Sequence, residues 1–183
     1  MAVTPGAFLP PVLQQAAAFL KGRAGLRVTK DKTKDVKDAM HHLTLKKVMV
    51  GIPAQKASRP GTPINNAALG YIHEHGSPAR NIPARPWLVP GTRQAQKDYL
   101  PHLKKAAELA MSGDKHSVDV ELHSAGIVAV SGVKLYFNTA NFVPLRPSTL
   151  AARRRAGFLG TRPLVRTGQL RNAINYVLRG AGA

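Results

Sequence analysis

The sequence contains no cysteine among its 183 residues. This absence excludes disulfide scaffolds, thiolate zinc sites and enzymes that use a cysteine nucleophile. It is compatible with assembly in a reducing cytoplasm. Long hydrophobic runs are also missing, because no stretch approaches the roughly 18 apolar residues of a transmembrane helix. Prolines and glycines interrupt the start of the chain, so neither a secretory signal nor a membrane partner is expected; the interruptions are Pro5, Gly6, Pro10 and Pro11.

Aromatic residues are scarce, at 5% of the chain, whereas there are 16 glycines and 14 prolines. The core must therefore rely on Ala, Val, Leu and Ile, with long irregular connections between elements. The length favours one globular domain. We expect an α+β fold in which three or four helices pack on a small, mostly antiparallel sheet. Residues 1–45 are expected to form an N-terminal helix and a charged arm, and residues 46–183 the α+β domain.

Acidic charge is scarce too, since 9 Asp and Glu face 27 Lys and Arg and give a formal net charge of +18. No acidic residue follows Glu121, so the C-terminal part of the chain cannot neutralise itself. Its basic groups require nucleic acid, an acidic neighbouring subunit, or simply solvent and counterions.

The sequence offers little for catalysis or metal binding. It has no glycine-rich phosphate loop of Walker or Rossmann spacing, and its acids are scattered, so we expect neither an enzyme nor a cofactor. His73 and His75 in YIHEHG would lie about 200° apart on a helix and cannot share a metal. His41 and His42 lack a third ligand. We interpret the residues of the HEH group as solvated polar residues at a helix end, and no metal is expected.

Periodicity and turn residues predict the elements of the N-terminal half. Residues 12–21 predict a helix, and residues 27–38 predict a surface loop or exposed arm, with a short helix as the alternative. KVMVGI at residues 47–52 predicts a strand. Residues 65–75 predict a helix that ends at Gly76.

The middle of the chain is rich in proline. Residues 77–90 carry too many prolines for a helix or a central strand, which predicts an extended connection anchored by Trp87. Residues 92–111 predict a helix in which Pro101 makes a kink or marks the first turn. Residues 118–139 fit either a hairpin around a Ser-Gly turn or a helix.

The C-terminal region predicts two short helical segments and a strand. Ser148 is expected to cap a helix over residues 149–155, and Thr167 a turn over residues 168–173. Residues 174–178 predict a strand. The consecutive arginines at 153–155 would spread around a helix and form a charge cluster, not a stripe facing a groove. With few aromatic residues nearby, this predicts non-specific phosphate affinity without sequence readout.

Three segments resemble the neck and tail-completion proteins of tailed bacteriophages: IHEHGSPARNIPARPWLVPG at 72–91, PLRPSTLAARR at 144–154 and PLVRTGQLRNAINYVLR at 163–179. The family is the virion-morphogenesis and minor-tail family of Mu-like and lambdoid siphophages. In it, a PARPFL element precedes a long helix, and a PL-TG-L-N-I-Y-V element closes the chain in a strand. The resemblance covers residues 48–179, although Trp87 stands where Phe is more usual, and it favours the helix for residues 118–139.

The resemblance implies a structural virion protein of the phage neck or tail end, assembled in the host cytoplasm. Such a protein forms a homo-oligomeric ring, with six-fold symmetry favoured, that completes the tail and supports head–tail joining. Its neighbours would be the tail terminator, the tail tube or tape-measure end, or the head connector, with DNA nearby. The alternative is a basic protein that binds nucleic acid without sequence preference. The candidate partner-contact residues are Arg153, Arg154, Arg155, Arg166, Arg171, Trp87 and Leu88; Trp87 could equally complete its own core.

Overall fold

The computed structural model describes residues 31–180, so the helix expected over residues 12–21 lies outside the described part. Within residues 31–180 the chain forms seven α-helices and a two-stranded antiparallel sheet, an α+β arrangement with more helices than expected. The elements are α2 (Thr33–Leu45), β1 (Lys46–Gly51), the 3₁₀ turn η1 (Ala54–Lys56), α3 (Asn66–His75), the 3₁₀ turn η2 (Pro78–Arg80), α4 (Leu88–Gln94), α5 (Gln96–Ser112), α6 (Lys115–Thr139), α7 (Pro147–Arg155), α8 (Gln169–Ala173) and β2 (Asn175–Gly180).

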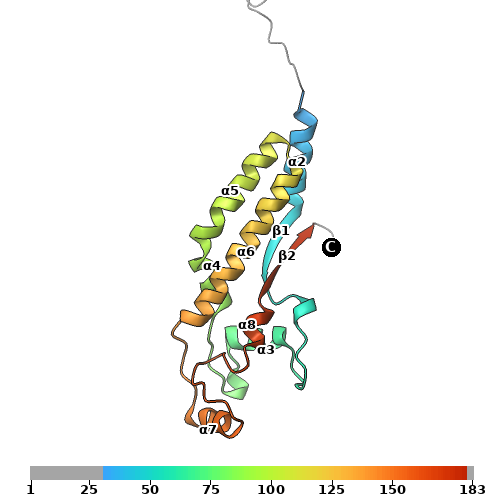
Figure 1. Ribbon diagram of the computed structural model, residues 1–183. Helices are drawn as coiled ribbons and strands as arrows, with labels where there is room; N and C mark the ends of the chain where they lie inside the picture. Colours follow the sequence, from blue (N-terminus) through green and yellow to red (C-terminus); the bar gives the residue numbers. More distant parts are fainter. Residues whose placement is uncertain (1–30, 181–183) are drawn as a thin grey trace, which may run out of the picture. The chain divides into compact units, whose positions relative to one another are not determined.

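Helix α6 lies at the centre of this part of the chain. Of the two alternatives for residues 118–139, the helix is correct, because the apolar side chains recur at helical spacing and Val118, Val133 and Phe137 are fully buried. Helices α4 and α5 pack along α6, and β1, β2 and α2 also contact it (Figure 1). The sheet and helices α2, α4 and α5 are therefore arranged around α6.

Two glycines allow these neighbours to approach α6 closely. A Cβ atom on Gly126 would lie 2.3 Å from Cδ2 of Tyr176 in β2. A Cβ atom on Gly132 would lie 2.3 Å from the Cβ of Ala95, which lies between α4 and α5. Both distances are below any real carbon–carbon contact, so a larger residue at either position would push the sheet or the helices away.

The sheet confirms both predicted strands. β1 and β2 pair antiparallel, with Val48 opposite Leu178 and Val50 opposite Tyr176. One pair packs on the cluster of α2, α5 and α6 side chains, and the other on the cluster around Trp87. The strand that closes the described chain thus covers both parts of the core.

The proline-rich segment is anchored by Trp87, as the sequence predicts. The Trp87 side chain is 2% exposed, donates from Nε1 to the carbonyl oxygen of Gly70 over 3.2 Å and meets Phe137 edge to face. The segment is not extended throughout, since η2 forms one 3₁₀ turn. Trp87 therefore belongs to the core of this chain.

The helix expected over residues 92–111 is two helices. α4 already begins at Leu88 and contains Pro90, and α5 begins at Gln96 and continues through Pro101. Pro90 is tolerated because it falls in the first turn, where no backbone donor is needed. Pro101 lies inside α5 and therefore does not mark its first turn. The end of α5 at Gly113 and the end of α3 at Gly76 follow from the positive φ of both glycines.

Three other predictions about helix ends need correction or completion. For residues 27–38 the alternative, a helix, is correct from Thr33 onward, since α2 begins there and continues to Leu45. Ser148 caps nothing, because α7 begins one residue earlier at Pro147, whose fixed φ suits a first helical position. Thr167 is not the cap of α8 either, because Gly168 occupies that position with φ of 77°.

The start of α4 is held by Glu74 at the end of α3. Its Oε2 accepts hydrogen bonds from the backbone N–H groups of Trp87 (2.7 Å) and Leu88 (2.8 Å), and its Oε1 accepts one from Val89 (3.0 Å). The carboxylate thereby satisfies N–H groups that a helix start leaves unpaired, at the positive end of the helix dipole. The interpretation of Glu74 as a solvated polar residue was wrong.

We expect Glu74→Gln to lower the free energy of unfolding by about 1–3 kcal/mol, because the new amide nitrogen faces backbone donors and one acceptor is lost. The control is Glu108→Gln, since Glu108 is exposed and only approaches Lys104 at 3.9 Å. Its effect should stay within about 0.5 kcal/mol. Chemical denaturation measures both values, and equal effects of the two substitutions would contradict the capping role.

Candidate functional site

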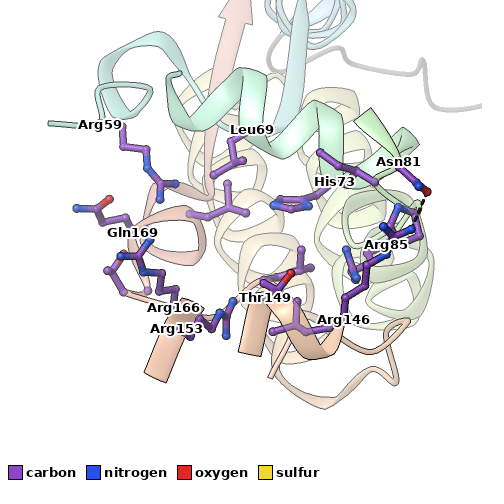
Figure 2. A pocket seen from close by; sticks show the side chains of 17 residues that line it. Arg59, Leu69, His73, Asn81, Arg85, Arg146, Thr149, Arg153, Arg166 and Gln169 are labelled. Carbon is purple, nitrogen blue, oxygen red and sulfur yellow. Dashed lines mark hydrogen bonds between the residues drawn. The ribbon is translucent and has the colours of Figure 1, made fainter. Parts of the chain in front are cut away.

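The candidate site is a cavity of about 310 Å³. Helices α3 and α7 form opposite walls. The rest of the lining comes from the segments that precede α3, α4 and α7, and from the loop that leads into α8 with the first residues of that helix. Figure 2 shows Leu69 and His73 projecting into it from α3 and Thr149 and Arg153 from α7. Segments far apart in the chain thus meet at one hollow.

The cavity is lined by arginine. Five arginines line it: Arg59, Arg85, Arg146, Arg153 and Arg166. Among the described residues that form the lining, none is acidic. Figure 2 places Arg59, Arg153 and Arg166 at one end of the cavity, and Arg85 and Arg146 at the other. The cavity therefore has a strongly positive surface.

Two of these arginines also hold the walls in place. Arg85 is buried, and its Nε donates to the carbonyl oxygen of Val143 over 2.7 Å while Nη2 donates to that of Pro144 over 3.1 Å. The Nη1 group of Arg153 lies within 3.1 Å of three carbonyl oxygens in the loop before α8, those of Gly160, Arg162 and Val165. Burial lowers the pKa of both guanidinium groups from its usual value, and in Arg153 the charge of Arg166 adds to this.

The other three arginines have fewer or weaker partners. Nη2 of Arg146 donates to Oδ1 of Asn81 over 2.6 Å, and the guanidinium of Arg166 lies 4.5 Å from the ring centre of Phe158. Nη1 of Arg59 makes only a long 3.5 Å contact with Asn66, and its Nε is buried without a partner within the described chain. A buried donor without an acceptor is costly, so this group has capacity for a ligand.

His73 lies among these charges and is uncharged at neutral pH. Burial, followed by the positive charges of Arg85 and Arg59, lowers its pKa from 6.5 to about 4. Its Nδ1 is also buried without a partner among residues 31–180. The interpretation of His73 as a solvated residue at a helix end was therefore wrong.

The cavity is also the place where the backbone is strained. Among residues 31–180 only Asn81 (φ 55°) and Leu164 (φ 63°) are non-glycine residues with positive φ, and both line the cavity. Asparagine tolerates this conformation, but leucine does so at a cost of about 1–2 kcal/mol. Such strain is more common at functional sites than elsewhere.

The structure brings together only two of the residues nominated from the sequence, Arg153 and Arg166. Arg154 and Arg155 are exposed on α7, and Arg171 is half-buried on α8. Trp87 is in the core, and Leu88 is half-buried against the same cluster of side chains. These five nominated residues lie outside the cavity lining.

Sequence reasoning missed four basic or titratable residues of the cavity: Arg59, His73, Arg85 and Arg146. The segments that carry the family resemblance contain the last three, which is a signal that could have nominated them. Arg59 lies outside those segments and only the fold places it here.

Among the described residues, no three His, Asp or Glu side chains are arranged to hold a metal ion. In the same part of the chain, every helix is too short or too polar to cross a membrane. No protein-family model, curated protein or solved structure matches this chain.

We expect the imidazole of His73 to titrate near pH 4 in NMR spectra, with its resonance assigned by its loss in His73→Gln. Because the unfolded pKa of about 6.5 lies above the folded value of about 4, the unfolded state binds the proton first as pH falls. The wild type should lose up to about 3 kcal/mol of stability relative to His73→Gln between these pH values. A midpoint near 6.5 would contradict burial among arginines.

Proposed function

We propose that this protein is a structural subunit of a tailed-phage neck or tail end. It assembles in several copies as a ring, with six-fold symmetry favoured, completes the tail and supports head–tail joining through contacts between its basic surface and acidic neighbours. It acts by surface complementarity and not by catalysis.

The observation that carries the proposal is the convergence of the three family-like segments. All but two of the 17 residues that line the cavity, Arg59 and Leu69, belong to residues 72–91, 144–154 or 163–179. Each segment by itself is a weak signal. Their meeting at one place supports the view that the resemblance marks one functional unit and not three separate coincidences.

The distribution of charge supports a basic contact surface. The ion pairs within residues 33–180 all join α2, β1, α5 and α6, for example Asp119 with Lys46 at 2.7 Å and Glu121 with Lys105 at 2.6 Å. α7 and the cavity use none of these acids. Their positive charge is available to a partner, and complementary charge raises the rate and specificity of association.

The alternative function is binding of nucleic acid without sequence preference, which the net charge of +18 favours. Weak binding to DNA at low salt is expected under both functions, because any polyanion is attracted to such a charge. The two functions differ in what happens to the particle when the protein is altered.

We expect Arg154→Glu with Arg155→Glu to leave the melting temperature unchanged, since both side chains are exposed. In a phage that depends on the variant, incorporation into particles should fall by about tenfold or more. The control is Arg93→Glu with Lys97→Glu, which makes the same charge change at exposed residues of α4 and α5. Arg153 is left intact, because its carbonyl contacts hold the loop before α8.

Electron microscopy of particles and immunodetection of the protein provide the measurements. Loss of the protein should leave filled heads and unattached tails, and the wild type should appear in several copies around the tail axis. Absence from purified particles would contradict the structural role. Empty heads, together with DNA binding that survives about 200 mM salt, would favour the nucleic-acid function instead.

A further inference from the structure

We propose that the arginine-lined cavity binds a carboxylate group on an acidic segment of a partner protein. The inference deepens the proposed function and rests on it for one point, that the partner is a neighbouring virion protein. The binding chemistry itself follows from the cavity.

The donors of the cavity match a carboxylate. A guanidinium presents a planar fork of N–H groups that can bind both oxygens of a carboxylate. Arg85 uses Nε and one terminal nitrogen on carbonyl oxygens, which fixes the group while its remaining N–H groups stay available at the cavity wall. At the other end, the buried Nε of Arg59 has no partner within the described chain. An entering carboxylate supplies the acceptors and the negative charge that this surface lacks.

The walls between the arginines are apolar and favour an acidic side chain over nucleic acid. The described lining contains five aliphatic side chains and no Phe, Tyr or Trp; the aliphatic ones are Leu69, Ile82, Leu145, Leu164 and Leu170. The stem of a glutamate can pack on such walls while its carboxylate reaches the arginines. Single-stranded nucleic acid would find no ring on which to stack. Duplex DNA carries its phosphates on a convex surface, which does not fit into a cavity of about 310 Å³.

A second copy of this chain is a poor source of the carboxylate. Each copy has 27 basic and only 9 acidic residues, so a neighbouring copy offers few carboxylates. Two of its carboxylates, those of Asp119 and Glu121, are already bound by basic side chains of the same copy. The charge balance therefore points to a different, acidic protein.

The test measures binding of a labelled hexaglutamate peptide to the purified full-length protein by fluorescence anisotropy. We expect Arg59→Gln with Arg166→Gln to weaken binding by more than about tenfold, because each lost guanidinium removes charge-assisted hydrogen bonds. The control Arg93→Gln with Lys97→Gln removes the same net charge from α4 and α5 and should change binding by less than about threefold. Arg59 and Arg166 are substituted, and Arg85 and Arg153 are not, because the last two also bind backbone carbonyl oxygens that hold the fold.

A second measurement needs no variant. In NMR spectra of the wild type, the peptide should shift the ring resonances of His73 more than those of the exposed His41. Equal losses for the two double variants, or no shift at His73, would show that the peptide responds only to net charge and would overturn the inference. If the cavity variant weakened a short DNA duplex as much as the peptide, nucleic acid would replace the acidic protein as the occupant.

The outcomes separate this inference from the proposed function. If the peptide does not bind in the cavity while Arg154→Glu with Arg155→Glu still blocks incorporation, the inference fails and the proposed function stands. If the peptide binds as expected but the protein is absent from particles, the cavity chemistry stands and the virion partner does not.

Discussion

The carboxylate of Glu74, bonded to the backbone N–H groups of residues 87–89, is the contact on which the cavity depends. It joins the end of α3 to the start of α4, and the same junction places Trp87 in the core with Nε1 on the Gly70 carbonyl. Since both ends of the proline-rich segment are fixed, the residues between them can form a wall. His73 and Arg85 face the cavity because they flank these fixed points.

The prolines of this segment lower the entropy cost of ordering it. The prolines of residues 77–90 restrict the unfolded chain, so ordering the segment costs less conformational entropy than it would for a flexible loop. The segment can therefore present polar residues such as Asn81, with its positive φ, without a hydrophobic core of its own. Trp87 and Glu74 stabilise that wall, so the side chains on its surface can be charged, as Arg85 is.

Charge is divided between two regions of the described chain. Around α6, acids such as Asp119 and Glu121 pair with basic residues of α2, β1 and α5 and contribute to holding those elements. Around the cavity, guanidinium groups are held by carbonyl oxygens and carry uncompensated positive charge. A partner that supplies negative charge would complete the second region in the way that Asp119 and Glu121 complete the first.

The sequence by itself determined the two strands, the end of α3 at Gly76 and the anchoring role of Trp87, because these depend on local turn residues, periodicity and one large side chain. Periodicity alone could not decide between a helix and a hairpin for residues 118–139. The sequence also misplaced the caps of α7 and α8, because neither helix start is capped by a side-chain hydrogen bond. For the candidate site it nominated Arg153 and Arg166 from charge. Only the tertiary structure brought Arg59, His73, Arg85 and Arg146 to them, because a cavity built from segments up to about a hundred residues apart has no spacing that a sequence can display.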